Sequence, residues 1–467
     1  MLTGASTVAP LLLLMAQPLL TRLYEPSEYG AFGIFEASLA ICVALSALGF
    51  NLPIPVRDSD LEAEQLLLIS VITVALLSLC LYLPLDVYKV EIGQLFGAEL
   101  LVPYLWLLPV AVFCSGCYQA FNSWALRRGA FPDIARARFA QGLTQVAAQV
   151  CLGLMGMNVL GLLAGLVIGR MSALLALAWK TGIAPLKAAA SPFSPRALGD
   201  AAWRNRSFPM LASWSSVISV LSLQASVLLV GYWHGAETVG FFSLAFLVVA
   251  GPLHIVNGAV VQAFLGEAST LDRGSQLAAA SLELFRSLSR IGLVPALLFA
   301  SLAPDLFGAI FGDSWRAAGE FARLLAPALI ISFIGAHLPA IVILRGEQRR
   351  ELQFSCSHLA ARVAALTIGA LFGAASLSVG LYAMVSILFL LSYDSWLLRI
   401  AGNSPGKIAR LLLGEGCIAL LLVSPLWLSN ALPGEEYFWP ALFVSVVAWL
   451  ARLVSSVSRA ELSGAGP

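Results

Sequence analysis

The stretch LLTRLYEPSEYGAFGIFEA, residues 19–37, interrupts a strongly apolar chain with a short polar segment. Residues 22–29 within it hold an Arg, two Glu, a Pro and two Tyr. Pro26 suits the first position of a helix, where no backbone N–H donor is needed, and Glu28 suits the positive end of the same helix. Because apolar runs flank the segment on both sides, it predicts a hairpin between two membrane helices.

The composition of the whole chain also indicates membrane helices. Of its 467 residues, 59% are apolar and only 11% are charged, against roughly 25% charged in a soluble domain. Apolar runs of about 20 residues recur along the chain, and each is long enough to cross a membrane as a helix. We therefore predict an all-α polytopic membrane protein with about 14 transmembrane helices. Thirteen is the alternative, because the fifth and sixth runs nearly touch. The predicted spans are 2–21, 29–54, 66–88, 101–124, 139–157, 159–180, 209–233, 240–266, 284–303, 320–344, 352–375, 378–398, 408–429 and 437–455.

The basic residues orient these spans. Counted with the adjoining ends of the spans, the loops after even-numbered spans and the C-terminal tail hold 21 Lys and Arg residues, whereas the loops after odd-numbered spans hold 4. Cytoplasmic loops of membrane proteins carry the excess of Lys and Arg. We therefore expect both termini in the cytoplasm and the hairpin at residues 19–37 on the external face.

The two halves of the chain resemble each other in sequence. Pro109 lies eighteen residues before Arg127 in the fourth span, and Pro327 lies eighteen residues before Arg345 in the tenth. The opening stretch has a counterpart in WHGAETVGFFSL, residues 233–244, in which Gly240 matches Gly30. Since six spans per copy is an even number, both copies insert the same way up, which makes the repeat parallel.

This repeat predicts four parts and a cavity between the two lobes near the membrane midplane. The lobes are related by a pseudo-twofold axis along the membrane normal. The parts are an N-terminal six-helix lobe (1–180), a cytoplasmic linker (181–208), a C-terminal six-helix lobe (209–399) and two additional C-terminal helices (400–467).

The hairpin also carries a family resemblance. Residues 20–24 (LTRLY), Pro26, Tyr29-Gly30 and Phe32 resemble the start of bacterial polysaccharide-transport flippases of the multidrug/oligosaccharidyl-lipid/polysaccharide exporter superfamily. The span count, the twin lobes and the basic linker extend this resemblance over the whole length. It implies alternating-access transport of a polyprenyl-diphosphate-linked oligosaccharide across the bacterial inner membrane, for synthesis of O-antigen, capsule or exopolysaccharide. The resemblance also leads us to expect further cytoplasmic residues before the first span.

Two basic residues lie near the middle of predicted spans and not at their ends. Arg170 and Arg362 fall near the middle of the sixth and eleventh spans, where an Arg costs roughly 2.5–3.5 kcal/mol on insertion scales. His358 lies one helical turn from Arg362. One interpretation is that these residues line the cavity and bind the diphosphate of a lipid-linked sugar, as Arg commonly binds phosphate. The other is a hydrogen bond between helices, and for Arg170 we prefer it.

Further polar side chains fall within or at the ends of spans. Gln141, Gln145 and Gln149 form one stripe on a helix face, which suits either sugar hydroxyls or contacts between helices. At the repeat offset of 218, Thr144 of this helix matches Arg362, so both helices should present polar faces to one cavity. Three charged residues complete the candidate set. The resemblance favours Arg22 as a cavity residue, and Glu36 and Asp394 are candidates for coupling to a cation or proton.

Several functional classes are disfavoured by the sequence. A net charge of +1 predicts no nucleic-acid partner, and the absence of a G-x-x-x-x-G-K-[ST] run argues against ATP hydrolysis by this chain. A polymerase or glycosyltransferase would carry a large external loop or paired acids on soluble loops. We therefore expect a non-enzyme without cofactor or metal, whose partners are the lipid-linked oligosaccharide, membrane lipid and polysaccharide polymerase or chain-length proteins. Cation-coupled drug efflux is the alternative transport function, and a scaffold role in polysaccharide assembly is another.

Overall fold

The computed structural model describes residues 2–181, 195–206, 208–268, 275–431 and 437–462. Within these ranges the chain is built from helices, without a strand. Ten of the described helices are long and apolar enough to cross a membrane, judged by length and composition. The predicted all-α membrane fold is confirmed. Residues 182–194 and 207 of the predicted linker at 181–208 lie outside the described residues, and most of the rest forms one short helix.

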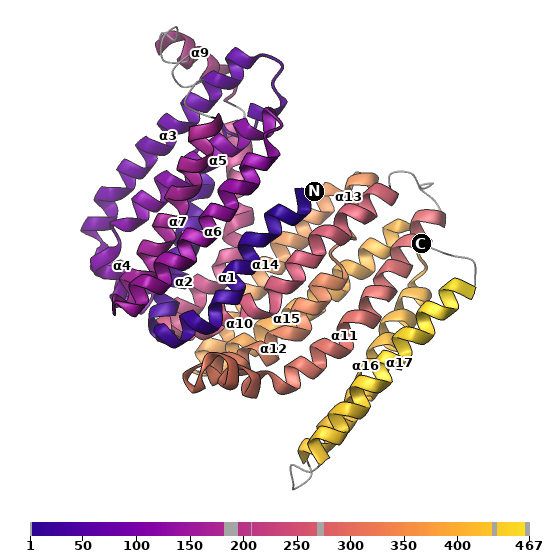
Figure 1. The fold of residues 1–467 in the computed structure, drawn as a ribbon. Coiled ribbons are helices and arrows are strands. Elements are labelled where there is room, and N and C mark those ends of the chain that lie inside the picture. Colours follow the sequence, from indigo (N-terminus) through magenta and orange to yellow (C-terminus); the bar gives the residue numbers. More distant parts are fainter. Residues whose placement is uncertain (1, 182–194, 207, 269–274, 432–436, 463–467) are drawn as a thin grey trace. The chain divides into compact units, whose positions relative to one another are not determined.

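The helices are numbered as in Figure 1. Short 3₁₀ or π turns connect several of them, at Ile54–Val56, Glu99–Tyr104, Phe208–Ala212 and Asp313–Trp315. The helices are α1 (Leu2–Leu23), α2 (Pro26–Ser46), α3 (Asp60–Val87), α4 (Lys89–Leu95), α5 (Leu107–Arg127), α6 (Phe131–Leu154), α7 (Asn158–Thr181), α9 (Pro195–Arg204), α10 (Ser213–Ala268), α11 (Ser275–Phe311), α12 (Arg316–Ile334), α13 (Pro339–Arg345), α14 (Gln348–Leu371), α15 (Ala375–Ala401), α16 (Pro405–Ala431) and α17 (Phe438–Leu462).

Helix is present in every predicted span, but some boundaries differ. The predicted second span reaches residue 54, whereas α2 ends at Ser46 and the backbone turns through Leu48 and Gly49 at φ 45° and 71°. Glycine adopts the left-handed region without strain, so the turn at Leu48 and Gly49 prevents α2 from continuing past Ser46. In α10 the helix breaks at Gly235, with φ 79° and ψ 175°, between the predicted seventh and eighth spans. The count of fourteen membrane crossings stays a prediction.

By their contacts, the residues form two compact units. The first comprises Met1–Leu247 and Gly308–Trp315, and the second comprises Val248–Phe307 and Arg316–Pro467. This grouping rests on contacts, whereas the two lobes were inferred from the sequence repeat, so the lobe boundaries stay a prediction. In the first unit, α5 packs against α2, α3 and α7, while α6 packs against α1 and α7 (Figure 1). Trp124 and Leu66 are fully buried in one of its cores.

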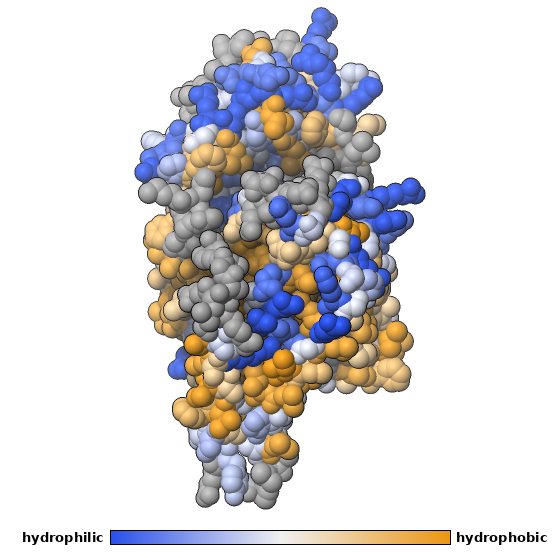
Figure 2. Space-filling model, turned by 90° about the vertical axis from the view of Figure 1, so that its right-hand side faces the viewer, coloured by the Kyte–Doolittle hydropathy of each residue, from blue (hydrophilic) through white to orange (hydrophobic). Residues whose placement is uncertain are grey.

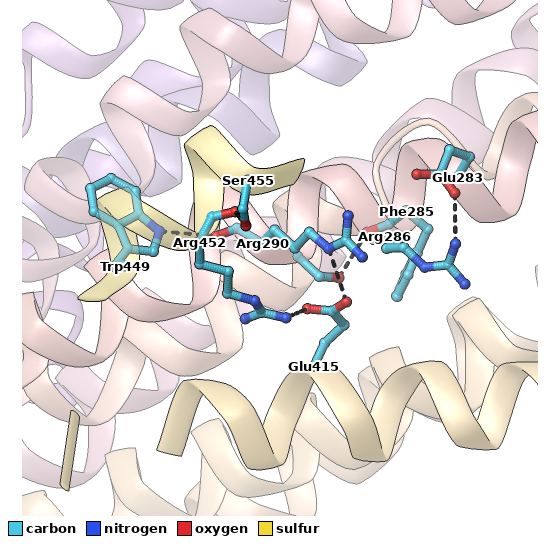
Figure 3. Close-up of polar contacts among 9 residues, drawn as sticks. Glu283, Phe285, Arg286, Arg290, Glu415, Trp449, Arg452 and Ser455 are labelled. Atoms are coloured by element: carbon cyan, nitrogen blue, oxygen red, sulfur yellow. Dashed lines mark hydrogen bonds and ion pairs between the residues drawn. The ribbon is translucent and has the colours of Figure 1, made fainter. Parts of the chain in front are cut away.

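In the second unit, α15 packs against α12, α13, α14 and α16, and α16 packs against α17 (Figure 1). Val294 of α11 lies in a core with Val423 of α16. A buried carboxylate adds to this attachment, because Glu415 of α16 accepts hydrogen bonds from Arg290 of α11, at 3.1 Å, and from Arg452 of α17 (Figure 3). The two C-terminal helices are therefore joined to α11 by apolar packing and by an ion-pair triad.

Large apolar side chains are exposed along many helices. Leu79 and Leu83 of α3 are 71% and 70% exposed, as are Trp439 and Phe443 of α17 at 71% and 70%. On the face shown in Figure 2, hydrophobic residues cover broad areas and hydrophilic residues gather in separate patches. Exposed apolar surface on this scale needs a hydrophobic surrounding. The chain is a multi-pass membrane protein.

Candidate functional site

The hairpin between α1 and α2 has the predicted form. Pro26 is the first residue of α2. The N–H of Glu25 donates to the carboxylate of Glu28 at 2.9 Å, and this hydrogen bond caps the N-terminus of the helix. Tyr24 is buried, and its hydroxyl donates to the backbone oxygen of Gln149 at 2.6 Å. Burial, with a smaller effect from Glu28, raises the pKa of Tyr24 to about 12, so the hydroxyl keeps its proton as a donor.

At this hairpin α2 crosses the second segment of α10, and the contact is reciprocal. A Cβ atom added to Gly30 would overlap the carbonyl oxygen of Ala236, and one added to Gly240 would overlap the carbonyl oxygen of Pro26. Pro26 and Ala236 are each the first residue of their helical segment, and each glycine is the fifth. Such a self-complementary contact is what a twofold relationship between two copies produces. The matched glycines therefore lie at equivalent positions and touch each other.

Two further contacts follow the same pattern within the first unit. Gly97, after α4, meets the start of the second α10 segment, where the N–H of Ala236 donates to its oxygen at 3.3 Å. Trp315, before α12, meets the α1–α2 hairpin, where its indole N–H donates to the oxygen of Thr21 at 2.9 Å. Trp315 is fully buried and packs edge-to-face on Tyr29, with ring centroids 5.4 Å apart. Each half of the chain thus contributes a segment that hydrogen-bonds to the backbone near a helix start in the other half.

A cluster of polar side chains lies next to this crossing, between α1, α2 and α7. The hydroxyl of Tyr29 donates to Gln17 of α1. Tyr29 and Glu36 lie on one face of α2, and Arg170 of α7 lies within electrostatic range of Glu36, although these two described residues do not form an ion pair. The Nε of Arg170 is buried without a hydrogen-bond partner among the described residues. The structure therefore brings together Glu36 and Arg170, which the sequence suggested for separate roles.

The amide stripe of α6 faces α7. Gln145 and Gln149 are 4% and 2% exposed, and Gln149 donates to the backbone oxygen of Leu162 at 3.2 Å. A Cβ atom on Gly165 or Gly169 of α7 would collide with these two glutamines, so the glycines allow close approach of the helices. Gln141 is only half-buried. This placement gives Gln145 and Gln149 a packing role, and their binding role stays a prediction.

Arg362 and His358 lie on α14 in the second unit. The guanidinium of Arg362 lies over the ring of Tyr382 of α15, 4.5 Å from its centroid, and hydrogen-bonds the same tyrosine's hydroxyl. The ring of His358 stacks on Phe389 at 5.3 Å. The Nε atom of Arg362 and the Nε2 atom of His358 are buried without a hydrogen-bond partner among the described residues.

A cavity of about 180 Å³ lies nearby in the same unit. It lies where the predicted tenth span is interrupted, because α12 ends at Ile334 and α13 begins only at Pro339. Pro339 favours the interruption, since it has no N–H to donate to the helix before it. In a membrane protein, irregular backbone is tolerated where it is buried or lines a cavity. The residues lining the cavity are Ala250, Leu253, His254, Asn257, Leu329, Ser332, Phe333, Gly335, Ala336, Pro339, Leu390, Tyr393 and Asp394.

Asp394 is the charged residue of this cavity. Its side chain is 2% exposed and lies against Gly335, where a Cβ atom would overlap the carboxyl group. Among the described residues, neither Oδ2 of Asp394 nor Oδ1 of Asn257 has a hydrogen-bond partner. Two buried oxygen acceptors therefore belong to the lining of a small, largely apolar cavity, where a bound proton, cation or water would satisfy them.

A second cavity, of about 120 Å³, shares Leu390 and Tyr393 with the first and includes His358 in its lining. His337, in the interruption itself, is fully buried against Phe264, with ring centroids 4.9 Å apart. This interruption was not predicted from the sequence. The signal was present as Gly335 and Pro339 inside one apolar span, since paired Gly and Pro mark broken membrane helices.

The remaining candidate is Arg22. It lies in the last turn of α1 and is exposed. The candidate residues thus fall into one set in each unit. The first contains Arg22, Glu36, Arg170 and the α6 glutamines, and the second contains His358, Arg362 and Asp394.

Comparison with known proteins identifies the fold and the family. The structure is similar to that of the lipid II flippase MurJ in an inward closed conformation, with a TM-score of 0.75 and 13% identity over 99% of each chain. It is also similar to an inward-facing multidrug resistance MATE family transporter of the MOP superfamily, with a TM-score of 0.63 and 16% identity over 88% of this chain and 98% of that one. A MOP superfamily transporter from Pyrococcus furiosus matches with a TM-score of 0.53 and 16% identity, over 88% and 95% of the two chains.

No curated protein sequence matches the chain. The sequence model of the family described as "Polysaccharide biosynthesis protein" matches residues 19–320, which begin at the hairpin and span more than half of the chain. The predicted resemblance is confirmed on both counts, the fold by the structures and the family by the sequence. The chain therefore belongs to the polysaccharide biosynthesis protein family.

Proposed function

We propose that this protein is a flippase that moves a polyprenyl-diphosphate-linked oligosaccharide from the cytoplasmic to the periplasmic leaflet of the bacterial inner membrane. Transport by alternating access would form no covalent bond, so we expect no enzymatic activity. The product would serve the synthesis of a surface polysaccharide, together with a polymerase and chain-length proteins.

The observation that carries this proposal is the family match at residues 19–320 on a chain whose fold resembles a lipid II flippase over its whole length. A multi-pass membrane protein that serves polysaccharide biosynthesis needs a substrate with a membrane-soluble end. An oligosaccharide on a lipid carrier has that property. The combination favours translocation of such a carrier over synthesis of the sugar.

Arg362 is our candidate for binding the diphosphate. A polyanion in a low-dielectric membrane site needs a fixed cation. The guanidinium of Arg362 is oriented by the ring and hydroxyl of Tyr382, which leaves its unpartnered Nε as a donor. His358 on the same helix face would add a second donor. Arg22 and Arg170, and the amides of Gln141, Gln145 and Gln149, are further candidates for contacts to phosphate and sugar.

Glu36 and Asp394 are our candidates for coupling transport to a proton or cation. Glu36 lies within electrostatic reach of Arg170, so a change in its charge would alter the α2–α7 contact. Asp394 lines a cavity at an interrupted helix, with one carboxylate oxygen unpartnered among the described residues. Interrupted helices commonly surround the ion and substrate sites of secondary transporters.

Cation-coupled drug efflux is the second candidate function, because the fold also resembles a multidrug resistance MATE family transporter. The two functions predict different phenotypes for a strain that lacks the gene. A flippase mutant should lose surface polysaccharide and accumulate one lipid-linked oligosaccharide, with unchanged drug susceptibility. Normal surface polysaccharide together with increased drug susceptibility would contradict our proposal and favour efflux. Mass spectrometry of the lipid extract would identify the accumulated sugar.

A further inference from the structure

A cavity of about 390 Å³ lies between α11 and α16 in the second unit. This volume is within the roughly 300–1,000 Å³ that is typical of small-molecule sites. Its lining combines cationic and apolar side chains, with one carboxylate that is paired elsewhere. The lining residues are Leu282, Arg286, Lys407, Arg410, Leu411, Gly414, Glu415 and Ile418.

The carboxylates near this cavity are already paired. Glu415 forms ion pairs with Arg290 and Arg452, and Glu283 forms an ion pair with Arg286 at 2.8 Å (Figure 3). Among the described residues, no carboxylate forms an ion pair with Lys407 or Arg410. Among the described residues, five cationic side chains and two carboxylates leave three positive charges unbalanced around the cavity. An anionic occupant would balance them.

The two unpaired cations stand at the start of a long helix. Lys407 and Arg410 are three residues apart in the first two turns of α16, which begins at Pro405, so they share one face. The positive end of the helix dipole adds to their field there. The positive-inside rule places this end of α16 in the cytoplasm. The charges therefore lie where the cytoplasmic phospholipid headgroups are expected.

The apolar part of the lining continues from these charges along the helix. Leu411 and Ile418 are seven residues apart, about two turns, and lie on the side of α16 that lines the cavity. An occupant that fits both parts has an anionic head and an apolar chain. A soluble phosphate would contact only the cationic part.

We propose that this cavity binds the headgroup of an anionic membrane phospholipid, with the phosphate at Lys407 and Arg410 and an acyl chain along Leu411 and Ile418. Basic pockets between transmembrane helices at the cytoplasmic side bind such headgroups. A lipid bound here would bridge α11 and α16 and so strengthen the attachment of the two C-terminal helices. The site is separate from the residues proposed for transport and does not depend on the transported substrate.

The test uses the full chain, purified and reconstituted in nanodiscs of phosphatidylcholine with or without phosphatidylglycerol of the same acyl chains. Binding of a fluorescent phosphatidylglycerol and the melting temperature are measured for the wild type, for Lys407→Gln/Arg410→Gln, and for Arg349→Gln/Arg350→Gln. The last variant is the matched control, because it removes two exposed cations from α14 in the same unit. Both double variants change the net charge equally, so non-specific attraction is controlled.

We expect the wild type and the α14 control to bind phosphatidylglycerol equally and to melt at a higher temperature when it is present. The α16 variant should bind it roughly tenfold to thirtyfold more weakly, since each basic residue contributes on the order of 1 kcal/mol. Its melting temperature in phosphatidylcholine alone should match the wild type, which excludes misfolding, and Lys407→Arg should bind normally. Equal binding by both double variants would overturn the proposal. So would equal stabilisation by glycerol 3-phosphate alone, because a soluble phosphate would then suffice.

Discussion

Gly30 and Gly240 meet where α2 crosses the second segment of α10, and each leaves room for the carbonyl oxygen of the first residue of the other helix. The sequence repeat matched these glycines across two hundred residues, and the structure brings them into contact. Because Pro26 and Ala236 make the same contact from opposite sides, the crossing is symmetric although the side chains around it differ. This relationship ties the two halves of the chain together inside one compact unit.

We predict that Gly30→Ala and Gly240→Ala both destabilise the protein. Each added methyl group would meet backbone atoms, which cannot move aside as a flexible side chain can. Overpacking typically costs roughly 1–3 kcal/mol. Melting temperature and the monodisperse fraction in detergent would measure the effect. Gly258→Ala in α10 is the control, because its Cβ atom would meet nothing within 4 Å. A melting temperature unchanged in all three variants would contradict the close crossing.

We predict that Glu36 and Arg170 depend on each other. Glu36→Gln leaves a lone cation on α7, and Arg170→Gln leaves a lone anion on α2. A lone charge at membrane depth costs roughly 2.5–3.5 kcal/mol on insertion scales. Each single variant should therefore lower membrane abundance, and the double variant should recover most of it. Quantitative immunoblotting of the four forms completes the cycle. Additive losses in the double variant would show that the charges are not coupled.

We predict that Arg362 acts through its charge. Arg362→Lys should retain part of the complementation of surface-polysaccharide synthesis, since an ammonium can still lie over the ring of Tyr382. Arg362→Gln should lose most of it at normal membrane abundance. Tyr382→Phe keeps the ring and removes the hydroxyl, so it should cause a milder loss. Full complementation by the Gln variant would make the residue structural, as would disappearance of the Lys and Gln variants from the membrane.

We predict a membrane topology with the hairpin outside. Reporter fusions at Ser27 and Ala236 should report the periplasm, and a fusion at Lys407 should report the cytoplasm. The reason is the excess of Lys and Arg in the even-numbered loops. Alkaline phosphatase and green fluorescent protein fusions report the two compartments in opposite senses. A periplasmic signal at Lys407 would refute the orientation, and opposite signals at Ser27 and Ala236 would refute the parallel repeat.

The sequence was informative wherever a local rule applied. Apolar run lengths located the helices, and Pro26 and Glu28 marked the start of α2 correctly because helix capping depends only on neighbouring residues. The repeat matched Gly30 to Gly240, but their direct contact could not be inferred, since matching positions do not specify which surfaces meet. The helix end at Ser46 could not be located because the apolar pattern continues past Gly49.

The candidate site was less predictable. Single charged residues could be chosen by their depth in a span, but their partners belong to other helices. The proximity of Glu36 to Arg170 and the hydrogen bond between Arg362 and Tyr382 depend on helix rotation, which a uniformly apolar sequence does not specify. The interruption before Pro339 lies within one apolar run and so resembles continuous helix, although it positions Gly335 against Asp394.

A translocation assay with purified protein would test flipping most directly. Proteoliposomes would contain a radiolabelled polyprenyl-diphosphate oligosaccharide, identified from the strain that lacks the gene, and an added glycosidase would digest only the outer-leaflet molecules. Protein-free liposomes should leave about half of the substrate protected, whereas the wild-type protein should expose nearly all of it and Arg362→Gln should expose little beyond the protein-free amount. Protection that stays the same with and without the wild-type protein, under an imposed proton or sodium gradient, would contradict the flippase function.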